Sequence, residues 1–421
     1  MRAAVLLVVA LALTGCSGAA TGTRRPPVST TASASQSGPA ADGAAADPAE
    51  VACALDGLLR RRENAVLGGD SEAYLATVDR PTAAAGVRQL AAFRSARALG
   101  LARLVHGPVP DVADPAAGVV VELGYRVEGV DRADRTTTVR YRLARSDGGW
   151  RVSAEDPEGP AAAAPWLAMP GMRVERGERA VVAGTAGDAA LAEAVATVDR
   201  VLPTLDAPWP GTPRRVLVLV PRTEAQAAAL LGRGRAGGGE VAATTEGPLD
   251  AAGLATGDRV VLDADAGRRL TPTGREVVLA HELTHVAVRA TLAGSAPAWL
   301  TEGYADHVGY ARANLPVREL AAPLVRAVRA GRAPTTLPTA ADLDPAGGDI
   351  EVGYLAAWQA VELVAQERGE SAVRALVRAC TVPGPASAGE TACDRAMPRV
   401  IGLTRSDLTR EWRQRLAALA R

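Results

Sequence analysis

Lysine is absent from the 421-residue sequence, and aromatic residues are few, at 3% of the chain. All 47 basic residues are therefore arginines, and 47 acidic residues balance them. A net charge of zero gives no overall field that would recruit nucleic acid or an anionic surface. We therefore expect no binding to nucleic acid.

Long apolar runs are also missing, apart from residues 3–13. This run follows Met1-Arg2, is too short to span a bilayer, and leads into Leu13-Thr14-Gly15-Cys16, which is typical of a signal peptide. The small residues before the cysteine resemble the bacterial lipobox, so residues 1–16 are expected to be removed or modified with Cys16 lipidated. The alternative is an ordinary cleaved signal with a chance cysteine. The predicted location is extracytoplasmic, at the outer face of the cell membrane.

Cysteine is scarce, with four in the chain, and three remain once Cys16 is assigned to lipid. Cys380 and Cys393 bracket a segment rich in proline, glycine and serine, so a short-range disulfide between them is the preferred pairing in an exported protein. A pairing with Cys53 stays open. One of the three must be unpaired within the chain.

The length and a hydrophobic content of 48% favour two folded units with tails. Residues 17–47 have almost nothing to bury and are expected to form a flexible tether. Helical spacing follows from residue 48, and alternating β-branched residues then predict strands up to residue 157. Helices followed by a meander over residues 48–157 resemble the nuclear transport factor 2-like, cystatin-like α+β fold. His106 has no partner nearby in sequence and is expected in a loop.

An Ala/Pro stretch at residues 158–171 marks a linker before the second unit, residues 172–421. The pattern there predicts a strand at 172–184, a helix at 188–205 and further strands at 214–221 and 259–265. Helices then continue to the C-terminus, apart from the cysteine-bracketed loop. The predicted fold class of the whole chain is α+β.

The sequence His281-Glu282-Leu283-Thr284-His285 is an H-E-x-x-H motif. Positions i and i+4 share one face of a helix, so two imidazoles can hold one zinc ion while the glutamate acts on a bound water. Thr273 and Glu276 predict a capping box at the start of this helix, and Gly294 lies past its end. The remaining positions are mostly apolar, and the histidines and glutamate would be costly to bury without a metal ion.

A catalytic zinc site needs a third protein ligand, and Glu302 is the candidate. Pro297 suits the first turn of a second helix that folds back on the first. Asp306 lies one turn after Glu302, where it can accept the second ring N–H of a histidine ligand. His307 is the rival third ligand, although it points about 100° away from the face of Glu302.

The order H-E-L-T-H, a spacer, and then P-x-W-L-x-E-G-x-A-D resembles the gluzincins, specifically the bacterial peptidase MA-like family, over residues 172–421. A mixed sheet followed by helices is also the order of a zincin catalytic domain. The resemblance implies a tyrosine near the zinc ion that stabilises the oxyanion, and Tyr354 is the candidate. Tyr304 and Tyr310 are alternatives by sequence nearness. Metzincins are excluded because their glycine and third histidine are missing after His285.

The predicted function is therefore zinc-dependent hydrolysis of a peptide or protein substrate, with Zn²⁺ held by His281, His285 and Glu302. Glu282 is the predicted general base. The alternative is a catalytically degenerate surface lipoprotein that binds a ligand or partner. A purely structural zinc site is disfavoured, because three ligands beside a glutamate suit an open catalytic site.

Overall fold

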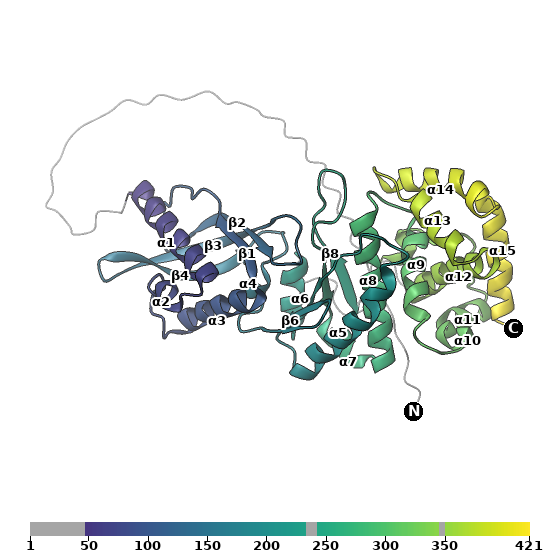
Figure 1. The fold of residues 1–421 in the computed structure, drawn as a ribbon, viewed down its shortest axis with the longest axis horizontal. Coiled ribbons are helices and arrows are strands. Elements are labelled where there is room, and N and C mark those ends of the chain that lie inside the picture. Colours follow the sequence, from purple (N-terminus) through teal and green to yellow (C-terminus); the bar gives the residue numbers. More distant parts are fainter. Residues whose placement is uncertain (1–46, 233–241, 345–349) are drawn as a thin grey trace, which may run out of the picture.

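The computed structural model describes residues 47–232, 242–344 and 350–421. The predicted signal peptide, Cys16 and residues 17–46 of the tether lie outside this range. The architecture is α+β, which confirms the predicted fold class. Figure 1 shows an N-terminal α+β part, a central sheet with its helices, and a C-terminal helical part. Within the described residues, no helix has the length and apolar character needed to cross a membrane.

The N-terminal part is a four-stranded antiparallel sheet, in the order β1-β2-β3-β4, covered by helices. Asp47 caps the first helix through its side chain, and Gly69 ends it in the left-handed conformation at φ 80°. His106 is the last residue of a strand, so the expectation that it lies in a loop was wrong. The elements are α1 (Pro48–Gly68), α2 (Ser71–Leu75), α3 (Ala84–Leu99), β1 (Leu101–His106), β2 (Val119–Val127), β3 (Arg135–Ser146) and β4 (Gly149–Glu158).

The central part is a five-stranded sheet in the order β5-β6-β7-β9-β8. Strands β6, β7 and β9 are parallel, whereas β5 and β8 are antiparallel edge strands. The strand expected at 172–184 is in fact two strands, and β8 had not been predicted. The elements are α4 (Pro165–Ala168), β5 (Arg173–Arg176), β6 (Ala180–Gly184), α5 (Asp188–Val201), η1 (Leu202–Leu205), β7 (Val216–Val220), α6 (Glu224–Leu231), β8 (Ala243–Glu246), β9 (Arg259–Leu262), α7 (Ala264–Arg269) and α8 (Pro272–Thr291).

Both faces of the central sheet are buried, as the continuous apolar runs of β6 and β7 require. Val182, Val218 and Val260 face the core formed with α5 and α8. The opposite face, which includes Leu217, joins the core of the N-terminal part. Trp166 from the predicted linker is buried in that second core. Within the predicted linker, residues 163–167 are therefore buried, whereas residues 159–161 are exposed.

The C-terminal part is helical, with α12 at its centre. The indole of Trp412 on α15 donates to the carbonyl of Ala356 on α12 at 3.0 Å. Cys380 and Cys393 form a disulfide, and Cys53 is free and exposed. Cys393 lies within α14, so only part of the bracketed segment is a loop. The elements are α9 (Ala298–Tyr310), α10 (Val317–Leu320), α11 (Ala322–Arg329), η2 (Ala341–Leu343), α12 (Ile350–Arg368), α13 (Glu370–Cys380), α14 (Ala386–Val400) and α15 (Arg405–Leu419).

Gly303 sets how closely α9 approaches α12. A Cβ atom at this position would lie 2.4 Å from the carbonyl oxygen of Ala357 and 2.8 Å from a methyl group of Val361. Neither neighbour can move freely, since one is helix backbone and both are buried. The close approach of the two helices therefore requires glycine beside Glu302.

We predict that Gly303→Ala lowers the stability of the protein by about 1–3 kcal/mol, because the added methyl group overpacks the α9–α12 contact. Gly57→Ala is the matched control, since Gly57 lies inside α1 and a Cβ there meets nothing within 4 Å. That control should be neutral or slightly stabilising. Thermal unfolding midpoints of the two variants test the prediction, and equal midpoints would contradict it.

Candidate metal centre

Helix α8 carries the H-E-x-x-H motif through the interior of the protein. Its cap is Thr271, whose hydroxyl accepts from the amide of Gly274 at 3.0 Å, and Pro272 is its first residue. The capping box expected from Thr273 and Glu276 is therefore wrong by two residues; Glu276 instead accepts from Arg200 at 3.0 Å. The observed cap places the start of α8 two residues earlier than the predicted capping box did.

Helix α9 packs antiparallel to α8, as predicted. Pro297 is its N-cap and not part of its first turn. His281 pairs with Asp306, and His285 with Glu302, so the chain direction reverses between the two helices. All four side chains are buried, with residue exposures between 0% and 4%. The fold thus brings the predicted ligands together.

Three donor atoms converge at the contact between α8 and α9. The Nε2 atoms of His281 and His285 lie 2.9 Å apart. Oε2 of Glu302 lies 3.2 Å from the first and 3.4 Å from the second. These three residues form a group that could hold a metal ion. Burying three such groups without a partner is costly, and a cation bound between them would offset that cost.

Asp306 fixes the orientation of His281. Its Oδ1 lies 2.8 Å from Nδ1 of the ring, so Nδ1–H donates to Asp306 and Nε2 is the atom that faces the other candidate ligands. Burial by itself would lower the pKa of His281, but Asp306 and Glu302 outweigh it and raise that pKa to about 10. The same pairing places a negative charge behind the ligand, which makes the ring a stronger donor to a metal ion.

Glu302 stays ionised in this site. Burial would raise the pKa of its carboxyl, but His285 and His281 lower it to about 2. A carboxylate that remains charged when buried is costly unless it is paired with cations. In the described structure this carboxylate lies 3.2 Å from His281 and 3.4 Å from His285, and a metal ion bound there would pair with it directly.

Glu282 lies beside the group and is held by Thr245, a residue that sequence reasoning missed. The hydroxyl of Thr245 lies 2.5 Å from Oε2 of Glu282 and 3.2 Å from its backbone carbonyl. The other oxygen, Oε1, is buried and has no hydrogen-bond partner among the described residues. Burial raises the pKa of Glu282, although His281, His285 and Thr245 act in the opposite direction. No sequence signal pointed to Thr245, because it sits in a four-residue strand.

The three candidate tyrosines differ in how they lie relative to the metal-ligand group. The ring of Tyr354 on α12 lies 6.4 Å from that of His281, and burial together with Glu302 and Asp306 raises its pKa well above the usual value. The hydroxyl of Tyr304 instead accepts from the indole of Trp209 at 3.0 Å, and the ring of Tyr310 packs on Trp358. Tyr354 is therefore the tyrosine with the best access to the site.

His307 does not join the metal ligands. Its ring nitrogens lie 2.9 Å from Glu362 and 2.7 Å from Glu370, on α12 and α13. These partners hold the ring on the side of α9 away from His281. The rival third ligand is therefore occupied elsewhere, in agreement with the helix geometry predicted for it.

An apolar cavity of about 470 Å³ lies between α5 and α8. Val278 and Leu279 on α8 line it, and they precede Glu282 by four and three residues, which places them on the same side of the helix. Its other walls come from the carboxyl ends of β7 and β9, where Val220 and Leu262 are the last residues. Two of the residues that line the cavity therefore lie about one helical turn before Glu282.

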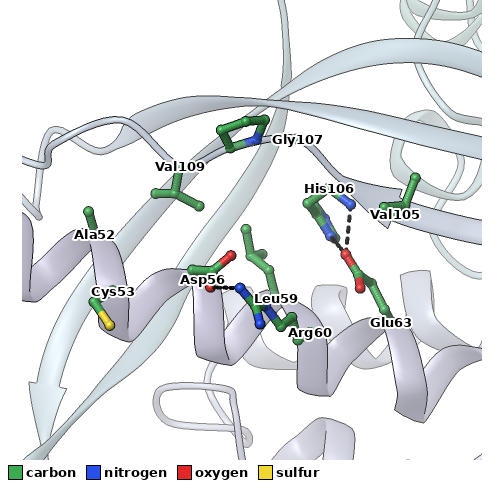
Figure 2. Close-up of a pocket in the computed structure, with 11 residues that line it drawn as sticks. Ala52, Cys53, Asp56, Leu59, Arg60, Glu63, Val105, His106, Gly107 and Val109 are labelled. Carbon is green, nitrogen blue, oxygen red and sulfur yellow. Dashed lines mark hydrogen bonds and ion pairs between the residues drawn. The ribbon is translucent and has the colours of Figure 1, made fainter.

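A second cavity, of about 630 Å³, lies in the N-terminal part between α1 and β1. Figure 2 shows Glu63 pointing across it to His106, at 2.7 Å between Oε1 and Nδ1, while Cys53 lies at the opposite end. The second ring nitrogen of His106 lies 2.7 Å from the hydroxyl of Tyr141. Both nitrogens of this histidine are thus satisfied within the protein, as in a structural role.

One known protein family matches a segment of the chain that includes part of this centre. Residues 221–291 match the family described as the eCIS core domain, a domain of the MA-like, zincin-like peptidase type. The match begins directly after β7 and ends at the last residue of α8, so it contains the H-E-x-x-H motif but not Glu302. No curated protein matches the chain.

We predict that His285→Ala reduces bound metal from about one ion per chain to roughly none, because two ligands do not close the site. Asp306→Asn should retain the ion but bind it about 10- to 100-fold more weakly, since the ring of His281 loses its acceptor. His307→Ala is the control and should bind normally. Elemental analysis and chelator competition measure these effects, and full metal content in His285→Ala would contradict the ligand assignment.

Proposed function

We propose that the protein is a zinc-dependent peptidase of the gluzincin type, with His281, His285 and Glu302 as ligands and Glu282 as general base. The observation that carries the proposal is the convergence of three buried donor atoms beside a fourth residue, Glu282, with one unpartnered carboxylate oxygen. A third ligand contributed by a glutamate on the following helix supports the gluzincin type.

Zinc fits the donor set in chemistry and in size. Two imidazole nitrogens and a carboxylate oxygen are ligands that catalytic zinc sites use. Zinc–ligand distances of about 2.0–2.2 Å in a tetrahedral site separate neighbouring donor atoms by roughly 3.3 Å. The three separations between the donor atoms here are 2.9, 3.2 and 3.4 Å. Three protein ligands would leave a fourth position for water.

A zinc ion bound at this site would supply Lewis acidity toward a water molecule and the scissile carbonyl. Glu282 accepts a proton from water and delivers it to the leaving amine. Its raised pKa makes the carboxylate a stronger base and favours the first step, and the second step proceeds because the leaving amine is more basic than the carboxylate. Thr245 holds one carboxylate oxygen and leaves the other, Oε1, for the proton.

Tyr354 is proposed to stabilise the oxyanion. Its hydroxyl stays protonated because its pKa is raised, so it can donate a hydrogen bond to developing negative charge. The position of Tyr354 on α12, across from His281, supports this role.

The cavity beside Glu282 is proposed to receive an apolar side chain of the peptide substrate. Ten of its lining residues are alanine, valine or leucine, and charged residues such as Glu193, Arg222 and Arg275 are among the remainder. Such a lining favours an apolar group through burial of surface area, while the distance of one helical turn allows the scissile bond to reach the glutamate. The resemblance of residues 48–157 to the nuclear transport factor 2-like fold and the lipid anchor at Cys16 remain part of the proposal.

We predict that Glu282→Gln binds zinc normally and lowers kcat by about 10²- to 10⁴-fold, because the amide cannot accept the proton. Tyr354→Phe should lower kcat less, with KM little changed, since it removes one hydrogen bond to the transition state. Cleavage of a peptide library by the purified protein, with metal content measured on the same samples, tests both. Wild-type activity in Glu282→Gln would exclude it as the base.

A bulky side chain introduced at the rim of the cavity tests whether the cavity receives part of the substrate. Ala190 on α5 lines it and is exposed, so Ala190→Trp should block the cavity without disturbing the core. We predict a rise in KM for peptides with a large apolar residue beside the cleaved bond, with bound zinc unchanged. Ala192→Trp is the matched control, because Ala192 is exposed on the same helix and does not line the cavity. Equal KM values in the two variants would contradict the assignment.

A further inference from the structure

The turn between β2 and β3 docks the N-terminal part onto the segment that joins β8 to β9. The amide of Arg132 in this turn donates to the carbonyl of Thr256 at 2.6 Å, and its guanidinium donates to the carbonyl of Ala255. Asp131 packs so closely against Gly257 that a Cβ there would lie 2.1 Å from its carboxylate. The two parts of the chain therefore meet at one side of the central sheet, the side that ends in edge strand β8.

Two ion pairs join the parts at this place. Arg259, the first residue of β9, holds Asp131 through both terminal nitrogens, at 2.7 and 2.8 Å, and both side chains are almost fully buried. Arg135, the first residue of β3, lies 2.6 Å from Glu246 and donates to the carbonyl of Gly257 at 2.8 Å. Glu246 and Arg259 are also paired across the β8–β9 ladder.

Strand β8 connects this interface to the metal centre. Glu246 is its last residue and reaches the N-terminal part, while its neighbour Thr245 points to the opposite face and binds Glu282. This opposition follows from the strand, where successive side chains alternate between faces. A displacement of Glu246 therefore moves the hydroxyl that holds the glutamate.

The far end of α8 is tied to the same segment. Arg289 holds Asp258 at 2.8 and 3.2 Å and donates to the carbonyl of Gly247 at 3.1 Å. Three arginines and three carboxylates thus alternate around the β8–β9 connection and fix it between the N-terminal turn and α8. We call this set the interface charge network; its members are Asp131, Arg135, Glu246, Asp258, Arg259 and Arg289.

We propose that the N-terminal part positions the proposed general base of the metal centre. Arg135 and Asp131 act as positioning residues that fix the place of β8 and, through Thr245, the orientation of the Glu282 carboxylate. The inference rests on the proposed function, since it assigns the N-terminal part a role in the same reaction. It differs from a separate ligand-binding module, which would leave the reaction unaffected when its contacts to β8 are cut.

Arg135 is the residue to test first. Its partner Glu246 has 26% of its side chain exposed, so it can be hydrated after the arginine is removed. Asp131 and Arg259 are buried at 0% and 1%, and cutting that pair would endanger folding. We predict that Arg135→Ala lowers kcat roughly tenfold or more through misplacement of the base, with KM changed less than about twofold and bound zinc retained.

The matched control is Arg142→Ala. Arg142 lies on the same strand β3 and pairs with Asp156 on β4 at 2.6 Å, within the N-terminal part. Its loss should leave kcat unchanged. Gly257→Ala is the second variant, because its methyl group would press on Asp131, and it should lower kcat as Arg135→Ala does at a temperature where its thermal unfolding curve shows it to be folded. Unchanged kcat in Arg135→Ala and Gly257→Ala would overturn the inference.

A double-mutant cycle tests whether the effect passes through Thr245. Thr245→Val removes the hydroxyl that holds Glu282 and should itself lower kcat. If Arg135 acts by way of this contact, the double variant Arg135→Ala/Thr245→Val is no slower than Thr245→Val alone. A full additive loss in the double variant would show that Arg135 acts by another route, and the inference would fail.

Hydrogen exchange separates this inference from the proposed function. Amides of residues 243–246 and 259–262 should exchange faster in Arg135→Ala than in the wild type or Arg142→Ala, whether or not any peptide is cleaved. Faster exchange with an inactive wild-type protein would refute the peptidase proposal and leave the positioning contact in place. Unchanged exchange together with an active wild type would refute the positioning role alone.

Discussion

The structure depends on the convergence of His281, His285 and Glu302 where two antiparallel helices cross. Three ionisable side chains at 2.9–3.4 Å are costly to bury, so the surrounding elements must compensate for their loss of hydration. Gly303 lets α12 approach from behind, and Asp306 compensates the charge of the imidazole. The helical C-terminal part is thus the support that brings α9 to α8.

A second requirement concerns Glu282. In the proposed site its carboxylate has to face the three metal-ligand candidates without itself binding the metal ion. Its position on α8 follows from the helix, but its carboxylate is directed by Thr245 from the edge strand β8. That strand is in turn held by the turn between β2 and β3 of the N-terminal part. The carboxylate of Glu282, the proposed general base, is therefore linked by contacts to a segment more than a hundred residues away in sequence.

The helices and strands that hold these residues are themselves fixed by burial of the central sheet on both faces. The central sheet is covered on one face by α5 and α8 and on the other by the core of the N-terminal part (Figure 1). Trp166 and its neighbours Ala164, Leu167 and Met169 fill the second contact, although an Ala/Pro-rich sequence is typical of an exposed linker. Composition alone cannot separate a linker from a packed segment, because burial depends on partners contributed by distant strands.

The sequence by itself determined the local features: the helix that carries His281 and His285, the alternating strands, the apolar runs of β6 and β7, and the α+β class. These follow from short-range periodicity and from the i, i+4 spacing. Tertiary structure decided the rest. His106 became a strand residue with two partners, His307 was drawn to Glu362 and Glu370, and Thr245 reached Glu282. Such pairings join residues far apart in the chain, and no local pattern encodes which distant side chains the fold will place within hydrogen-bonding distance.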